Sequence, residues 1–105
     1  MLYLIVQGDR PDAAAEIRQA KTDAHLTYLD QHEDILVLGG ALLTDDSGKR
    51  VGSVALINVP NRAAADAFVA NEPFRQAGLY QSILISRMRK GQWNPAVAPK
   101  TPEGD

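Results

Sequence analysis

The sequence contains no cysteine and no long hydrophobic run, and each absence excludes a class of protein. Without cysteine there is no disulfide bridge, no thiolate nucleophile and no cysteine metal site, which suits a reducing compartment. The apolar run at residues 2–6 follows Met1 without a basic flank and stops before Gly8, so it is too short for a signal peptide or a membrane span. We therefore expect a cytoplasmic protein without membrane contact.

An excess of positive charge is also missing, because the net charge is -2 at pH 7. Proteins that bind nucleic acids normally carry a strongly basic face to neutralise phosphates, so we expect no nucleic-acid partner. Hydrophobic residues make up 45% and charged residues 23% of the 105 residues, as in an ordinary globular protein. A chain of this length and composition is expected to form one folded domain.

The first half of the chain predicts a strand followed by a helix. Residues 2–7 are short and apolar, and the turn residues 8–11 end this strand. Apolar positions then recur at helical spacing from Ala13 toward Gln31, and Pro11 suits the first turn of that helix. On this helix we expect a buried stripe of Ile17, Ala20 and Ala24, with Arg18, Lys21 and His25 along its edge.

The second half predicts a hairpin, a helix and a last strand. Apolar runs at 35–43 and 51–59 flank the turn residues 45–48. Asn61 is a good N-cap for an alanine-rich second helix, which Pro73 should end. The run from Leu79 to Met88 is then the fourth strand.

Two strand-helix-strand halves in succession predict an α+β fold of the ferredoxin-like βαββαβ type. In this fold both helices pack on one face of a four-stranded antiparallel sheet. We expect this domain to occupy residues 1–91. Residues 92–105 contain several prolines and little to bury, so we expect them to form a C-terminal tail.

The predicted strands are apolar on both faces, since Leu2, Leu4 and Val6 alternate with Tyr3 and Ile5. A sheet with one face in water would alternate apolar with polar residues. Two helices cover only one face, so we expect a homodimer in which two sheets meet. A pocket for a small-molecule ligand is then expected between sheet and helices or near the interface.

Four residues stand out as candidates for a ligand site, and each has a plainer explanation. Arg18 either holds an anionic substrate or belongs to a solvated basic edge. Gly39 and Gly40 within a strand indicate either a pocket wall or close dimer packing. Phe74 either lines an aromatic-substrate pocket or packs in the core, and the same holds for Tyr3, Tyr28, Phe68 and Tyr80.

Metal and cofactor sites are not indicated. His25 and His32 are seven residues apart, about 10 Å along a helix, which is too far for both to bind one zinc ion readily. The chain has neither the glycine spacing of a phosphate-binding loop nor a dinucleotide-binding motif. We expect no metal and no cofactor.

An ordered set of short motifs resembles the YCII-related family of small ferredoxin-like proteins. The set consists of Arg18 and His25, Gly39-Gly40-Ala41-Leu42, Gly52-Ser53, Glu72-Pro73-Phe74 and Ala77-Gly78-Leu79. The resemblance covers about residues 1–90 and implies a dimeric α+β barrel. It also implies an active site formed by a histidine on the first helix, here His25, and an aspartate before Pro-aromatic. Glu72 stands where the family has that aspartate, and its extra methylene can place the carboxylate differently.

The family resemblance implies a small-molecule enzyme with a His-carboxylate pair, because some members resemble ring-processing enzymes such as a dehydrochlorinase of a chlorinated hydroxyquinol. Acid-base chemistry of the lyase or isomerase type on a small cyclic or aromatic metabolite is the expected activity. A histidine ring suits proton exchange near neutrality, and a carboxylate on one ring nitrogen makes the other a better base. The alternative is a non-enzymatic dimeric module that binds a metabolite or a partner protein, since many members have no established activity.

Overall fold

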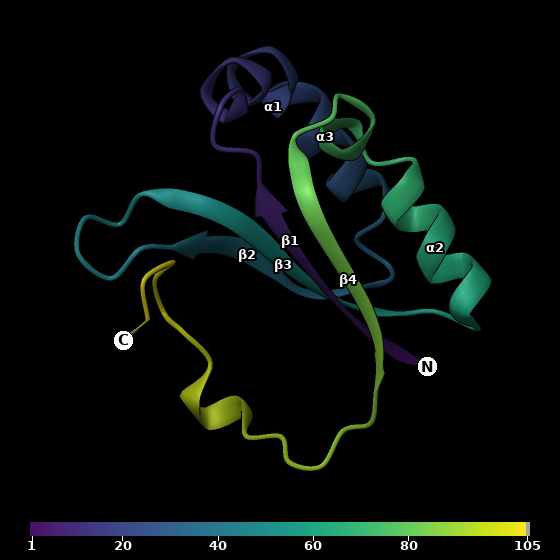
Figure 1. Ribbon diagram of the computed structural model, residues 1–105. Coiled ribbons are helices and arrows are strands. Elements are labelled where there is room, and N and C mark those ends of the chain that lie inside the picture. The colour runs from purple at the N-terminus through teal and green to yellow at the C-terminus, as the bar shows by residue number, and fades with distance from the viewer. Residues whose placement is uncertain (105) are drawn as a thin grey trace.

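Four strands form one antiparallel sheet in the computed structural model, which describes residues 1–104 (Figure 1). The strands are β1 (Leu2–Asp9), β2 (Leu36–Leu43), β3 (Arg50–Asn58) and β4 (Tyr80–Met88). They lie in the order β2-β3-β1-β4, and every neighbouring pair is antiparallel. This order and the intervening helices confirm the predicted ferredoxin-like α+β fold.

The helices all lie on the same face of the sheet (Figure 1). They are α1 (Ala14–Gln31), α2 (Arg62–Ala70) and the single turn α3 (Pro73–Gln76). The second helix ends ahead of Pro73, as predicted, and Pro73 in addition begins the separate turn α3, which the sequence did not predict. Proline fits a first helical turn because no intrahelical acceptor is needed for its missing N–H. The Glu72 carboxylate completes this start by accepting a hydrogen bond from the Arg75 backbone N–H at 3.1 Å.

The core lies between β1, β3 and α2. Alternate residues of β1 point at the helices, so Tyr3 and Ile5 are buried while Leu4 and Val6 face the other way. They pack with Ile57, Val59, Ala65, Phe68 and Val69, and Phe74 and Leu79 are buried as well. Each large side chain removed from water here contributes about 1.5–3 kcal/mol, which anchors α2 on the sheet.

The face of α1 that turns toward the rest of the molecule is not the predicted one. Ala20 and Ala24 of the expected buried stripe are exposed, and no residue of the helix is fully buried. Ile17 of that stripe is half-buried, and so are Arg18, His25, Tyr28, Leu29 and the C-cap residue His32. Polar side chains therefore face inward on α1, because partners from other elements receive them.

The two central strands approach closely where Gln7 on β1 is opposite Ser53 on β3. A Cβ on the adjacent Gly52 would lie 2.2 Å from the Gln7 carbonyl oxygen, so a side chain at this position would force the strands apart. The glycine thus allows the spacing that places the polar side chains of Gln7 and Ser53 side by side beneath α1.

The opposite face of the sheet carries apolar side chains and no helix (Figure 1). Cross-strand neighbours on this face form two rows, one containing Leu38, Leu56 and Leu4 and the other containing Val54, Val6 and Leu84. Leu38 is 61% exposed and Leu84 is 54% exposed. This face is apolar without being covered by the chain's own helices.

The residues after Gly91 run along the helix-free side of the sheet and contain one short 3-10 turn, Pro95–Val97 (Figure 1). The exposed apolar side chains of Trp93 and Val97 lie in this segment. Asp105, the last residue of the predicted tail, lies outside the described residues. Among residues 1–104, no helix has the length and apolarity needed to cross a membrane.

Candidate functional site

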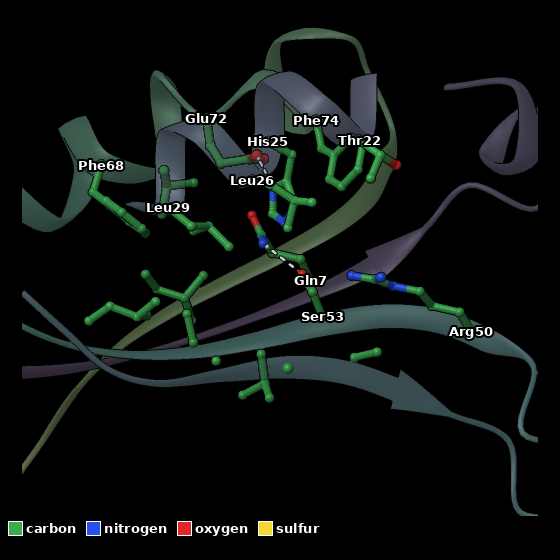
Figure 2. Close-up of a pocket in the computed structure, with 18 residues that line it drawn as sticks. Gln7, Thr22, His25, Leu26, Leu29, Arg50, Ser53, Phe68, Glu72 and Phe74 are labelled. Atoms are coloured by element: carbon green, nitrogen blue, oxygen red, sulfur yellow. Dashed lines mark hydrogen bonds and ion pairs between the residues drawn. The ribbon is translucent and has the colours of Figure 1, made fainter. Parts of the chain in front are cut away.

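A cavity of about 260 Å³ lies between α1 and the β2-β3 side of the sheet (Figure 2). Its floor includes Gly39, Gly40 and Ala41 of β2, whose small size leaves room under the helix. Gly39 and Ala41 are opposite Ala55 and Ser53 on the helix side, whereas Gly40 is opposite Val54, so a side chain at Gly40 would point to the helix-free face. Because α1 sends no large apolar side chain fully into the sheet, the space between them is not filled.

His25 and Glu72 meet at the roof of this cavity, with the His25 Nδ1 and Glu72 Oε1 atoms 2.5 Å apart (Figure 2). Their side chains are 13% and 5% exposed. Glu72 Oε2 accepts from the Arg75 N–H, so each carboxylate oxygen has its own partner. Glu72 therefore caps α3 and contacts the histidine on α1 at the same time.

The contact with Glu72 determines which nitrogen of the His25 ring carries the proton and which is free to accept one. An ionised carboxylate only accepts hydrogen bonds, so Nδ1 of His25 must carry the proton in their contact. In the neutral ring Nε2 then bears a lone pair, and it has no hydrogen-bond partner within residues 1–104. This nitrogen can accept a proton from a molecule in the cavity.

Phe74 holds the histidine ring from one side. The two ring centroids are 4.2 Å apart and the planes are inclined by 23°, which is a stacked pair. Phe74 is buried and also lines the cavity. Stacking and the Glu72 hydrogen bond together restrict both the tilt and the rotation of the His25 ring.

Arg18 lies on the other side of Phe74, with its guanidinium carbon 5.1 Å from the ring centroid. Two of its nitrogens donate to the buried Asp9 carboxylate, with the shortest N–O distance at 2.8 Å. Arg18 does not line the cavity, in contrast to Gly39, Gly40, His25, Glu72 and Phe74. The structure thus brings five of the six predicted site residues to one cavity wall and places Arg18 behind it.

Tyr28 fastens α1 to α2 beside the site. Its hydroxyl donates to the Phe68 carbonyl oxygen at 2.7 Å. Burial raises the pKa of Tyr28, and the nearby Glu72 charge raises this pKa further, so the hydroxyl is a neutral donor at physiological pH. This bond helps to keep the histidine-bearing helix at a constant height above the sheet.

A second polar group on the cavity floor was not predicted from the sequence. The Gln7 side-chain nitrogen donates to Ser53 Oγ at 3.0 Å, and Ser53 Oγ donates to the Tyr80 hydroxyl at 3.2 Å. Burial raises the pKa of Tyr80, against a smaller opposing effect of the Ser53 hydrogen bond. Figure 2 shows the Gln7 side-chain oxygen directed up toward His25, where it can accept a hydrogen bond.

Arg50 is the other missed residue. It stands at the start of β3, and its side chain extends into the cavity below Thr22 and Phe74 (Figure 2). For Gln7 a sequence signal existed, because the alternation of Tyr3, Ile5 and Gln7 places a polar residue on the inner face of β1. Nothing in the local sequence distinguishes Arg50 from an ordinary hairpin residue.

Within the described part of the chain, residues 1–104, no group of three or more histidine, aspartate and glutamate side chains is placed to hold a metal ion. The chemistry that the arrangement supports is proton transfer at His25 Nε2 next to an apolar space. Leu26, Leu29 and Phe68 form the apolar part of the wall.

Comparison with known proteins shows to which family and fold the chain is similar. The model of the YCII-related domain matches residues 1–89. A solved structure of 5-chloro-2-hydroxyhydroquinone dehydrochlorinase from Burkholderia phenoliruptrix, in complex with 2,5-dihydroxybenzoquinone, is 30% identical in sequence. The similarity covers 87% of this chain and 96% of that chain, with a TM-score of 0.80.

More distant structures share the fold alone. A NIPSNAP family protein from Agrobacterium tumefaciens is 14% identical, with 90% of this chain and 95% of that chain covered and a TM-score of 0.54. The protein Atu4242 from the same organism is 16% identical, with coverages of 90% and 98% and a TM-score of 0.55. No curated protein matches the chain.

The Asp9–Arg18 pair should contribute strongly to stability because both side chains are largely buried. We expect Asp9→Asn to lower the free energy of unfolding by on the order of 3 kcal/mol, since it leaves the Arg18 cation without its counter-charge. The matched control is Asp66→Asn, which breaks the exposed Arg62–Asp66 pair on α2 and should cost at most about 0.5 kcal/mol. Urea unfolding at neutral pH measures both, and equal losses in the two variants would contradict this assignment.

Proposed function

The chain belongs to the YCII-related family, and we propose that it is a small-molecule enzyme that performs acid-base chemistry on a small ring compound. His25 is the group that takes and returns the proton. Glu72 orients the histidine ring and stabilises it when it becomes charged. Gly39, Gly40 and Phe74 form part of the wall against which the substrate lies.

The observation that carries this proposal is the 2.5 Å contact between His25 Nδ1 and Glu72 Oε1 at the wall of the cavity. A proton on Nδ1 leaves Nε2 as the basic atom, and the adjacent carboxylate favours the imidazolium that forms after proton transfer. Such a positioned acid-base group contributes typically about 10²–10⁴-fold to a rate.

The reaction that fits is an elimination or an isomerisation within the ring. Nε2 takes a proton from an O–H or C–H group of the substrate, and the electron pair left behind forms a new double bond. In an elimination, a leaving group such as halide departs with its own bonding pair, so a proton and an anion are lost together. In an isomerisation, the imidazolium returns the proton to another atom of the same ring.

The cavity volume supports a substrate with a single ring. A cavity of about 150 Å³ suffices to bind benzene, so the 260 Å³ here admits one ring with several substituents. The similar structure from Burkholderia phenoliruptrix is a dehydrochlorinase of a chlorinated hydroxyhydroquinone. Halogenated and hydroxylated hydroquinones are therefore the first compounds to test.

Turnover should depend on the histidine-carboxylate pair. We expect at least one compound in a panel of chlorinated hydroxyhydroquinones to be a substrate. Turnover is measured by ultraviolet absorbance and by chloride release. His25→Ala should then reduce kcat by about 10²-fold or more because the base is gone. Glu72→Gln should also lower kcat, because an amide neither fixes the ring tautomer by charge nor stabilises the imidazolium.

The control is His32→Gln, which replaces the chain's other histidine, at the C-cap of α1 and outside the cavity lining. Its kcat should stay within about twofold of the wild type, since its ring contacts the Tyr28 carbonyl and not the cavity. Thermal unfolding of all three variants shows whether they are folded. An unchanged rate in folded His25→Ala refutes the proposed role, and ligand binding without turnover of any panel compound favours a metabolite-binding module instead.

We also propose that two copies of the chain pair through their helix-free sheet faces. The rows that contain Leu38 and Leu84 are apolar and exposed, while the opposite face is already covered by α1, α2 and α3. Contact between two such faces removes the apolar surface from water, and a stable interface buries roughly 800 Å² per partner.

Light scattering at micromolar concentration should give the mass of a dimer for the wild type. Leu84→Glu should shift this mass toward the monomer, because it places a carboxylate within the apolar interface. Ala63→Glu, which adds the same charge at an exposed position of α2, should leave the dimer intact. A monomeric wild type would contradict the proposed pairing.

A further inference from the structure

Arg50 brings a positive charge into the cavity without a negative partner from the protein. Its side chain lines the cavity from β3, with the guanidinium directed inward (Figure 2). Within residues 1–104 it forms no ion pair and no side-chain hydrogen bond. Partial desolvation lowers the pKa of Arg50 and the charge of nearby Arg18 lowers it further, against the opposing effects of Tyr80 and Asp9, while the residue as a whole stays exposed.

Arg18 provides a second, independent sign of a missing acceptor. Two of its nitrogens are satisfied by Asp9, but its Nη1 atom is buried and has no partner within residues 1–104. A buried N–H donor without an acceptor costs about 1–3 kcal/mol. Arg18 does not line the cavity, so it adds positive potential beside Arg50 and does not itself contact a bound ring.

Arg50 is the charged group at this end of the cavity that has no counter-charge of its own within residues 1–104. Arg18 and Arg50 carry two positive charges, whereas Asp9 supplies one negative charge, and the raised pKa of Tyr80 keeps that hydroxyl neutral. Glu72, the carboxylate in the cavity wall, contacts His25 and accepts from the Arg75 N–H. An anionic ligand in the cavity would supply the partner that Arg50 lacks.

We propose that Arg50, supported by Arg18, is an anion-binding subsite that selects ring substrates carrying an ionised oxygen, either a carboxylate or an acidic hydroxyl. This inference rests on the proposed function and names its substrate class. The apolar side chains of Leu29 and Phe68 lie on the other side of His25 from Arg50 (Figure 2). A bound ring therefore directs its ionised oxygen at Arg50 and its apolar edge at Phe68, with His25 Nε2 between them.

Such an oxygen also aids the proposed chemistry. A negative charge on a ring substituent raises the electron density of the ring and assists departure of an anionic leaving group. Arg50 holds that charge by a charge-assisted hydrogen bond, which contributes about 1.5–3 kcal/mol. Arg50 is thus a binding and specificity residue, whereas the proton transfer belongs to His25.

Binding of simple probes tests the subsite without any need for turnover. Benzoate is compared with benzamide, and 4-nitrophenolate with 4-nitroaniline at mildly alkaline pH, so that each pair differs in charge at nearly equal size. Calorimetric titration of the wild type should show each anion binding about tenfold or more tightly than its neutral isostere. Preference in only one pair identifies which source of ionised oxygen the subsite takes.

Arg50→Gln should abolish this preference, and Arg50→Met, which keeps the aliphatic stem, should do the same. Arg62→Gln removes an equal charge from an exposed position on α2 and should preserve the preference. His25→Ala should remove turnover while leaving the ratio of anion to neutral affinity unchanged, which separates the subsite from the proposed catalysis. The inference is overturned if neutral isosteres bind the wild type as tightly as the anions, or if the preference survives in folded Arg50→Gln and Arg50→Met.

Discussion

The buried Glu72 carboxylate is the group around which the helices are arranged. A carboxylate 5% exposed is costly unless its oxygens have partners, and both oxygens here do. Oε2 accepts from the first turn of α3, which ends the α2 segment and begins a new direction of the chain. Oε1 faces His25, which fixes how α1 lies over the sheet. One side chain thus caps α3, contributes to holding α1 and orients the histidine ring.

The cavity is a consequence of how α1 is held. A helix that docks by an apolar stripe closes the gap to its sheet, because its side chains interdigitate with those of the strands. Here Arg18, His25 and Tyr28 hold the helix by polar contacts to Asp9, Glu72 and the Phe68 carbonyl oxygen. The small residues of β2 beneath it leave the remaining space open. A local departure from ordinary packing of this kind is typical of functional sites.

Much of this fold could be predicted because it depends on local patterns. Short apolar runs, the Asn61 cap and the turn at 45–48 are local signals, and together they predict the sheet and its two main helices. The face of α1 could not be read in this way, since the partners of Arg18 and His25 lie on other elements. The end of α2 ahead of Pro73 could be predicted, because proline disfavours a helix before it, but the new turn that begins at Pro73 also needs the Glu72 cap.

The residues of the candidate site also differ in how far the sequence alone could predict them. His25 and Glu72 are 47 residues apart, so only the family resemblance could pair them before the structure was known. The inward position of Gln7 could have been predicted from the alternation of inward and outward residues along β1. The role of Arg50 depends on its lack of a partner, which only the tertiary structure reveals.

The central claim is that Glu72 holds His25 with the proton on Nδ1 and the lone pair on Nε2. Nuclear magnetic resonance of the ¹⁵N-labelled His25 ring tests this most directly, because protonated and unprotonated ring nitrogens have distinct chemical shifts. In the neutral ring we expect the signal of a protonated Nδ1 and an unprotonated Nε2, with mixed tautomers in Glu72→Gln. A wild-type ring with its proton on Nε2 would contradict the account, since His25 would then have no basic atom facing the cavity.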